Sequence, residues 1–441
     1  MSQSKRPRID PALMRGLTLP RTGSRALSRR DLFKYAGAGA GAVSMAAVLA
    51  ACGGDESDPA GNGGDTSVDP ATIYAGQPNG ELVFANWPLY LDFAKDQETG
   101  ERYSPSLRMF EEETGIAVTY AVDINDNASF FGEIQPILAN GDTPAYDIIV
   151  ITNGREFTAL TQNEWVWPLD PSKRPNFDAN AAKWAKDPTF DPDNKYSMAW
   201  QSGLTGIGYI PDKVKGGAIT KMDDLADPAK VGQGTVGMLK ADMPDFVMIN
   251  LGIDPISSTP AEWQEAANWL TMQRDSGTVR QYYDQGYADD LKAGNLAASM
   301  AWSGDVLYYN IWEGNPMEFV FPEGGALLWI DNMLIPTNAS NPLDAMTMMD
   351  FYYQPEVAQM VTEWVLYMSP VPATQDLILE HAEEVAADGD ESYAGQLEES
   401  GTSNYLYPSD EFLERTSFAR DLTTDEELEE WDSIFLPISE G

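Results

Sequence analysis

Two pairs of residues between positions 297 and 331 have the chemistry to bind a charged ligand: Trp302 with Asp305, and Trp329 with Asp331. An alkyl ammonium ion needs a carboxylate for its charge and a flat apolar surface for its methylene groups, and an aspartate beside an indole offers both. Either pair by itself is better explained as a core tryptophan with a capping aspartate. The interpretation of these four residues therefore depends on the rest of the chain.

Short apolar runs are expected to position both pairs. Residues 297–302 are nearly all apolar, which predicts a strand buried on both faces, and residues 303–305 are expected to turn the chain outwards. Residues 326–330 predict a second strand that ends at Asp331, before an apolar run resumes at Met333. Both acid and indole pairs are thus predicted to lie at strand ends.

The same alternation of apolar runs and amphipathic stretches continues through the chain and predicts an α/β fold. Thr259-Pro260 with Glu262 predicts a capping box at the start of one helix. The acidic stretch 380–403, which contains His381, is predicted to be an exposed loop. The predicted strands are 82–85, 117–122, 146–151, 196–200, 203–210, 235–239 and 279–283. Helices are predicted at 104–113, at 129–140, after Asp245, and from Pro260, Pro342 and Pro355, the last running to about Tyr367. Because of Pro136, the helix at 129–140 is expected to be kinked or to begin late.

The N-terminal residues are predicted to be an export signal rather than part of the fold. Arg29-Arg30 precede a short apolar segment, which is typical of a twin-arginine signal, and residues 49–52 resemble a lipoprotein cleavage site. We expect residues 1–51 to be a twin-arginine lipoprotein signal peptide, and Cys52 to be lipidated and to anchor the chain on the outer side of the cytoplasmic membrane. Residues 52–80, rich in Gly, Asp, Ser and Pro, are predicted to be a flexible tether.

Charge and composition exclude several classes of function. The formal net charge is -41, and the predicted signal holds nine of the 28 basic residues but only two of the 69 acidic ones. Such an excess repels phosphate, so nucleic acid is excluded as a partner, and it attracts cations. One cysteine and one histidine leave no thiolate or histidine metal site and no histidine-based triad, and no cofactor is predicted. A glycosidase with two carboxylates is the enzyme class hardest to exclude.

Collinear motifs carry a resemblance to a known family. They are Asn86-Trp87, Glu113-Thr114-Gly115-Ile116, Tyr146-Asp147-Ile148-Ile149-Val150, Phe190-Asp191-Pro192-Asp193-Asn194-Lys195-Tyr196-Ser197, Trp302-Ser303-Gly304-Asp305, Pro322-Glu323-Gly324-Gly325, Trp329-Ile330-Asp331 and Pro355-Glu356-Val357-Ala358. Together with the predicted lipoprotein signal, these motifs resemble the spermidine/putrescine-binding proteins of bacterial ABC importers. The resemblance implies a two-lobed, type II periplasmic-binding-protein-like fold, in which the ligand binds in the cleft between two α/β lobes.

The resemblance also implies domain boundaries and ligand-binding residues. Residues 81–202 and 332–441 would form the first lobe and 203–331 the second, with strands crossing between them near 203–210 and 331–335. The implied ligand-binding residues are Trp87, Tyr90, Thr152, Asp242, Asp245, Trp302, Asp305, Trp329, Asp331 and Tyr367. Pro88, Leu89 and Gly154 depart from the family, which usually has a hydroxyl and often an acid at the first two positions and an aromatic residue at the third.

The leading hypothesis is therefore a monomeric extracytoplasmic receptor that binds a polyamine and delivers it to the permease subunits of an ABC importer. A second hypothesis is the same fold binding a sugar or another neutral solute. A carboxylate glycosidase is a distant third.

Overall fold

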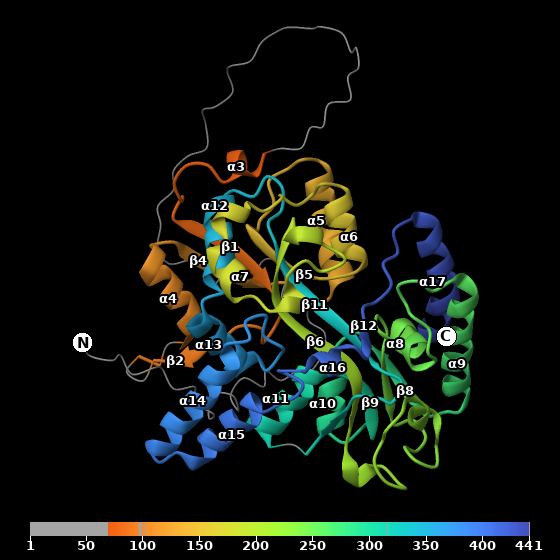
Figure 1. The fold of residues 1–441 in the computed structure, drawn as a ribbon. Helices are drawn as coiled ribbons and strands as arrows, with labels where there is room; N and C mark the ends of the chain where they lie inside the picture. Colours follow the sequence, from red (N-terminus) through yellow and green to blue (C-terminus); the bar gives the residue numbers. More distant parts are fainter. Residues whose placement is uncertain (1–68, 97–98, 101, 315, 441) are drawn as a thin grey trace, which may run out of the picture.

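The computed structural model describes residues 69–440, apart from 97–98, 101 and 315 (Figure 1). The predicted signal peptide, Cys52 and the first part of the predicted tether lie outside the described residues. Residues 69–80 do not form a free tether: helix α3 (Pro70–Ile73) leads into Tyr74, whose side chain is fully buried, and the N–H groups of Asn79 and Gly80 donate to Asp344 at 2.9 Å each. That part of the tether prediction is wrong, because Tyr74 anchors the segment in the core.

A ten-stranded sheet extends through the described residues in the order β4-β1-β5-β11-β6-β9-β7-β8, with β10 paired to β6 and β12 paired to β11. At one end, β1 pairs in parallel with β4 and β5; at the other, β7 pairs in parallel with β8 and β9. The strands are β1 (Glu81–Asn86), β4 (Ala117–Val122), β5 (Ile148–Thr152), β6 (Ser197–Tyr209), β7 (Val236–Leu239), β8 (Val279–Tyr283), β9 (Ala298–Trp302), β10 (Glu318–Val320), β11 (Ala326–Leu334) and β12 (Thr416–Ser417), with a separate short pair β2 (Ala94–Lys95) and β3 (Arg102–Tyr103).

The two ends of the sheet belong to two lobes with separate cores. One core gathers large side chains such as Phe84, Phe110 and Trp364, and the other gathers Phe246, Trp263 and Met300. In Figure 1, α4 lies on one side of β1, and α5 and α6 lie on the other. The helices of the first lobe include α4 (Pro105–Thr114), α5 (Asn127–Ala139), α6 (Arg155–Gln162), α7 (Pro175–Asn180), α12 (Pro342–Phe351) and α13 (Pro355–Val365); those of the second include α8 (Met243–Asn250), α9 (Pro260–Asp275) and α10 (Tyr287–Lys292). Helix α11 (Ser303–Glu313) follows a strand of the second lobe and contributes side chains to both cores.

Strands β6 and β11 join the lobes as an antiparallel pair. Along β6, Trp200 packs in the first core and Leu204 in the second, so the crossing falls between these residues, a little earlier than predicted. The segments 196–200 and 203–210, predicted as separate strands, are one continuous strand. Strand β11 is also continuous, so the predicted strand end at Asp331 is wrong; its pairing with β6 instead shifts register between Asp331 and Asn332, where the strand enters the first lobe.

Several local predictions are confirmed. The observed bounds of β4 and β8 are those predicted, and Glu262 accepts hydrogen bonds from the N–H and hydroxyl groups of Thr259 in the predicted capping box.

Two other local predictions differ from the structure. The expected outward turn at 303–305 is instead the first turn of α11. Helix α5 does not begin late: Asp126 caps it by accepting from the Ser129 N–H, and Pro136 lies inside it.

The acidic stretch 380–403 is not an exposed loop. It forms most of helices α14 (Thr374–Ala387) and α15 (Glu391–Gly401), which bury Ile378, Val385 and Leu397 on their inner faces. His381 is buried rather than on the surface, and its Nδ1 lies 2.9 Å from Oε1 of Glu363 on α13. The prediction failed because the density of acidic residues concealed a helical spacing of apolar ones.

The C-terminal residues pack on the second lobe, although the sequence assigned them to the first. Helix α16 (Asp410–Leu413) leads into β12, which pairs in parallel with β11 at Ala326 and Leu327. Helix α17 (Asp425–Glu440) lies beside α9, where the rings of Trp263 and Trp431 are 5.2 Å apart (Figure 1). Among the described residues, the structure contains no helix long and apolar enough to cross a membrane.

Candidate ligand-binding site

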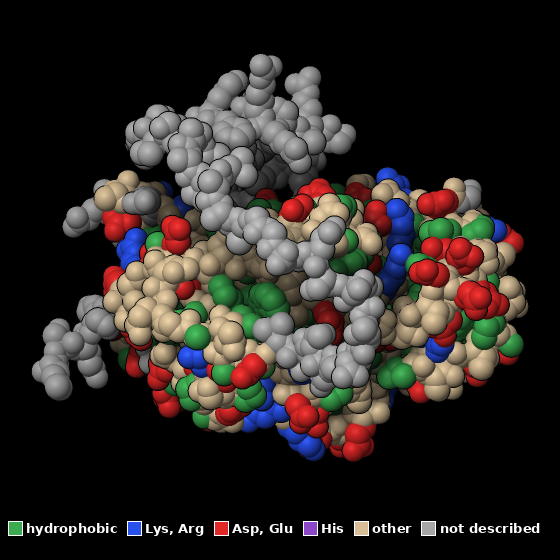
Figure 2. Space-filling view, turned by 90° about the horizontal axis from the view of Figure 1, so that it is seen from above, with side chains coloured by type: hydrophobic (Ala, Val, Ile, Leu, Met, Phe, Trp, Pro, Cys, Tyr) green, Lys and Arg blue, Asp and Glu red, His purple; other side chains and the backbone are tan. Residues whose placement is uncertain are grey.

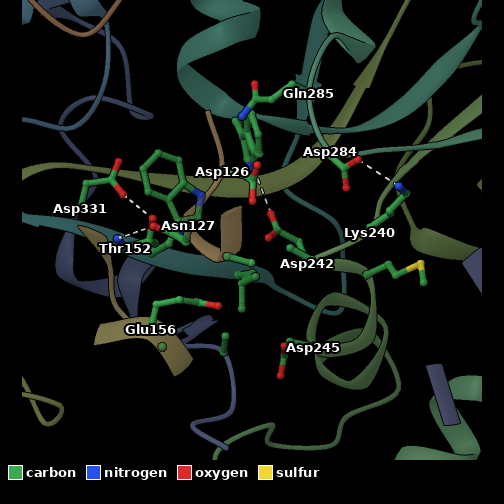
Figure 3. Close-up of a pocket in the computed structure, with 18 of the residues that line it drawn as sticks. Asp126, Asn127, Thr152, Glu156, Lys240, Asp242, Asp245, Asp284, Gln285 and Asp331 are labelled. Carbon is green, nitrogen blue, oxygen red and sulfur yellow. Dashed lines mark hydrogen bonds and ion pairs between the residues drawn. The ribbon is translucent and has the colours of Figure 1, made fainter. Parts of the chain in front are cut away.

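A cleft of about 630 Å³ lies between the lobes, beside the crossing strands. All ten residues that the sequence nominated line this cleft, although they come from positions as far apart as Trp87 and Tyr367. Figure 3 shows that its walls carry acids from both lobes, with Asp331 on one side and Asp242 and Asp284 on the other.

Asp331 is held at the middle of the crossing strand by two hydroxyl groups. It lies opposite Thr152 in the pairing of β11 with β5, and Tyr90 follows β1 nearby. Thr152 Oγ1 donates to Oδ1 of Asp331 and the Tyr90 hydroxyl donates to Oδ2, each at 2.6 Å. Burial raises the pKa of Asp331 to about 6; the charge of Asp242 adds to this rise, and the two hydrogen bonds oppose it.

Asp242 provides a second carboxylate, just before α8. Both of its hydrogen-bond donors reach Oδ2: Thr205 Oγ1 at 2.6 Å and the indole Nε1 of Trp302 at 2.9 Å. Burial raises the pKa of Asp242, and these hydrogen bonds lower it. Within the described part of the chain, Oδ1 of Asp242 accepts no hydrogen bond, and neither Asp242 nor Asp331 forms an ion pair with Lys or Arg.

Asp305 lies in the first turn of α11, where two tyrosines hold it. Tyr287 donates to Oδ2 and Tyr367 donates to Oδ1, each at 2.8 Å. Burial raises the pKa of both tyrosines well above the usual value, so their hydroxyls remain protonated donors. The pairing expected between Trp302 and Asp305 is therefore not direct: the Trp302 indole bonds to Asp242, and only its backbone N–H reaches the Tyr287 hydroxyl, at 2.7 Å.

Aromatic rings form the floor of the cleft. The ring of Tyr367 lies 5.3 Å from that of Trp329 and 5.5 Å from that of Tyr90. Two glycines allow this packing: a Cβ at Gly203 would lie 2.5 Å from the Trp329 ring, and one at Gly304 would lie 2.5 Å from the Tyr367 ring. Any side chain at either position would displace an aromatic wall of the cleft.

Asp245 lies in the same cleft but in a different setting. It is 4% exposed, and in Figure 3 its carboxylate points away from that of Asp242. Its Oδ1 accepts a hydrogen bond from the backbone N–H of Arg420, in the C-terminal segment, at 2.9 Å. Burial raises the pKa of Asp245 to about 7; the Arg420 N–H lowers it, and the charge of Asp242 raises it.

Other residues of the site were missed from the sequence. Thr205 and Tyr287 orient Asp242 and Asp305, and Glu156 points into the cleft from the first turn of α6 (Figure 3). The C-terminal segment contributes Arg420 and Trp431. Thr205 could have been found, because it alternates with apolar residues in a predicted strand that leads to the cleft; nothing local marks the others.

The arrangement can hold cations but shows no metal centre. Among the residues that the structure describes, no group of three or more His, Cys, Asp or Glu side chains is placed to bind a metal ion. The cleft instead offers three separate carboxylates, those of Asp331, Asp242 and Asp305, which accept hydrogen bonds from uncharged donors and lie beside aromatic residues. Two α/β lobes joined by a pair of crossing strands, with such a cleft between them, define a solute-binding protein.

The chain belongs to the bacterial extracellular solute-binding protein family, whose profile matches residues 106–390. It is 26% identical over 300 residues to the spermidine/putrescine-binding periplasmic protein of Escherichia coli (strain K12), covering 68% of this chain and 80% of that protein. It is 27% identical over 292 residues to the putrescine-binding periplasmic protein PotF of the same organism, covering 61% of this chain and 75% of that one.

Solved structures share the fold. The spermidine/putrescine ABC transporter substrate-binding protein PotD of Streptococcus pneumoniae superposes with a TM-score of 0.65 at 22% identity, covering 83% of this chain and 99% of that one. The TpPotD lipoprotein of Treponema pallidum superposes with a TM-score of 0.62 at 17% identity, covering 82% and 100%. The two-lobed architecture predicted from the sequence is therefore confirmed.

Proposed function

We propose that the cleft binds a polyamine such as putrescine or spermidine, and that the protein, as a monomer, delivers it to the permease subunits of an ABC importer. The observation that carries the proposal is the state of Asp331 and Asp242. Asp331 is buried and Asp242 is half-buried, and the described hydrogen bonds of both carboxylates come from uncharged groups. Burying such a negative charge costs free energy unless a cation compensates it. A ligand ammonium would supply that charge.

The distribution of acids and rings supports a ligand with at least two cationic ends. Asp331 lies on the strand that enters the first lobe, whereas Asp242 and Asp305 belong to the second. Trp329, Trp302 and Tyr367 lie along the cleft beside these acids and offer flat surfaces for the methylene groups between two ammonium ions. Trp87 and Thr152 complete the proposed set on the side of the first lobe.

Titration calorimetry with putrescine and spermidine tests this proposal. Binding should weaken as salt is raised, because the contacts are between charges. A neutral analogue of similar length, such as 1,4-butanediol, should bind at least roughly a hundredfold more weakly, since each lost buried charge pair contributes about 2–5 kcal/mol. If a sugar binds and neither amine does, the protein is a receptor for a neutral solute; if a glycoside is hydrolysed, it is an enzyme.

We further propose that Cys52 anchors the chain to the outer side of the cytoplasmic membrane after export by the twin-arginine signal. The support is the sequence alone: Arg29-Arg30, the apolar segment that follows them, and a single cysteine at its end. Cys52→Ser should leave a folded protein that binds its ligand but washes off membranes in salt. Retention of this variant on the membrane would show that the anchor lies elsewhere.

A further inference from the structure

Residues Thr416–Asp421, here called the C-terminal strap, are fixed to the second lobe. Strand β12 within the strap pairs with Ala326 and Leu327 of β11. The Arg420 guanidinium donates to the carbonyl oxygens of Ile256 at 3.0 Å and Ser258 at 2.9 Å, and it forms an ion pair with Glu427 at 2.7 Å. It also lies over the ring of Trp263, 5.1 Å from the centroid. These contacts leave the strap little freedom relative to the second lobe.

The same strap touches the first lobe. Oγ1 of Thr158, a buried residue of α6, donates to Oδ1 of Asp421 at 2.7 Å. The ring of Phe418 packs edge to face on that of Phe190, with centroids 5.6 Å apart, and Phe190 packs in turn on Phe157 of α6, at 5.2 Å. The strap therefore links the two lobes through side chains, in addition to the crossings that the chain itself makes along β6, along β11 and between α15 and α16.

The strap also reaches the cleft, and Asp245 is the point of contact. Ala419 and Arg420 line the cleft, and the backbone N–H of Arg420 donates to Asp245 Oδ1 at 2.9 Å. Asp245 is almost fully buried, and it points away from Asp242 (Figure 3). Unlike Asp331 and Asp242, Asp245 is thus bound to a backbone donor, beside the positive charge of Arg420.

We propose that the C-terminal strap ties the two lobes together at one end of the cleft, and that Asp245 is a positioning residue for the strap rather than a ligand for an ammonium group. The part that concerns the ammonium group rests on the proposed function. A tie between the lobes raises the population of the closed form, and the apparent affinity for ligand rises with that population.

Two substitutions at Asp245 separate the two roles. Asp245→Asn removes the charge but keeps an oxygen that can accept the Arg420 N–H, whereas Asp245→Ala removes both. A positioning residue predicts less than about a twofold change in putrescine affinity for Asn and roughly a fivefold loss or more for Ala, since a lost hydrogen bond weakens the closed form. A tenfold or greater loss that is equal in both variants would overturn the proposal, because it would mean that the charge itself binds the ligand.

The link to the first lobe is tested by Thr158→Val, which is nearly isosteric and removes only the hydroxyl. Thr161→Val is its matched control: Thr161 lies in the same helix, but its hydroxyl donates to the Phe157 and Thr158 carbonyls of that helix. We expect Thr158→Val, like Asp421→Ala, to increase the radius of gyration of the ligand-free protein in small-angle scattering, and Thr161→Val to leave it unchanged. In a double-mutant cycle, Thr158→Val should have no further effect once Asp421 is Ala.

These scattering measurements need no ligand, so they remain informative if no polyamine binds. In that outcome the proposed function fails, while the strap stands or falls on the radius of gyration alone. If Thr158→Val and Asp421→Ala lower thermal stability but leave the radius of the ligand-free protein unchanged, the strap is a packing contact of the second lobe and the proposed tie is wrong.

Discussion

Two buried aspartates of the first lobe, Asp147 and Asp350, differ from the aspartates of the cleft in their hydrogen-bond donors. In the first lobe, Asp147 accepts from the backbone N–H groups of Val83 and Asn341, at 2.9 and 2.7 Å, and from the Asn341 side chain at 3.1 Å. Asp350 similarly accepts from the N–H groups of Asn176 and Phe177, at 2.9 and 3.0 Å.

The aspartates of the cleft have donors of another kind. Asp331 and Asp242 accept from the side-chain hydroxyls of Tyr90, Thr152 and Thr205 and from the indole of Trp302. Of these donors, Tyr90, Thr152 and Trp302 line the same cavity. An ionised carboxylate offers about four acceptor sites, so two such donors leave others directed at the cleft. Backbone donors hold distant parts of the chain together, whereas side-chain donors orient a carboxylate and leave it available to a ligand. Asp245, with its backbone donor, belongs with the first group.

The largest effect should come from breaking the core group. Asp147→Ala removes the acceptor for three donors that join β1 and the start of α12 to β5, and each buried donor left unpaired costs about 1–3 kcal/mol. We expect the free energy of unfolding to fall by roughly 3 kcal/mol or more in urea denaturation. The folded fraction should bind putrescine as the parent does; a loss of affinity with unchanged stability would erase the distinction between the two groups.

Asp331→Asn should have the opposite pattern. The variant is nearly isosteric and removes a buried charge that no described Lys or Arg balances, so stability should be unchanged or higher. Putrescine binding should weaken at least tenfold, which corresponds to about 1.4 kcal/mol, in titration calorimetry at fixed salt. Asp305→Asn should behave similarly. If Asp331→Asn destabilises the fold and leaves affinity intact, Asp331 is a structural acid like Asp147.

The comparison also explains which parts of the site the sequence could predict. Asp331 and Trp329 are marked by their place in a short apolar run, and Asp305 by the Trp302-Ser303-Gly304-Asp305 motif. Strand positions followed because strands buried on both faces leave continuous apolar runs, as in β5 and β9. The sequence could therefore nominate the acids and aromatic residues of the cleft and most of the strands.

The partners of these acids could not be predicted. The indole of Trp302 reaches Asp242, 60 residues away, and not Asp305, three residues away, because the fold of the second lobe brings β9 beside β7. The strap was missed for a similar reason: Thr158 and Asp421 are 263 residues apart, and nothing in the local pattern of either connects them. Hydrogen bonds between distant segments depend on tertiary geometry, which periodicity does not encode.

Acidification should distinguish the cleft group by titration. The pKa of Asp331 is raised to about 6 in the ligand-free protein, and a bound ammonium would favour the charged form. Binding should thus be strongest above pH 6 and weaken as the pH falls through this value, roughly tenfold between pH 7.5 and 5 if Asp331 alone titrates, while the amines of the ligand stay charged throughout. The Asp331→Asn variant should lose the part of the pH dependence that comes from Asp331. If its affinity depends on pH as the parent's does, the pH dependence belongs to Asp242 or Asp245.

The smallest effect is expected from a third group, the acids on the outer surface. Asp and Glu side chains are scattered over the face of the molecule shown in Figure 2. Glu399, on α15, is another exposed acid. The net charge of -41 attracts cations from a distance, but one charge among 69 acidic residues changes that field little, and salt screens it beyond about 8 Å at physiological ionic strength. Glu399→Gln should therefore change putrescine affinity by less than about twofold and stability by less than about 0.5 kcal/mol. Glu399→Gln and Asp331→Asn each remove one negative charge. The difference between their putrescine affinities, measured by calorimetry at the same salt, therefore reports the effect of where the carboxylate lies, separately from the effect of its charge. Equal losses in the two variants would mean that the overall acidic field, and not the cleft, attracts the amine.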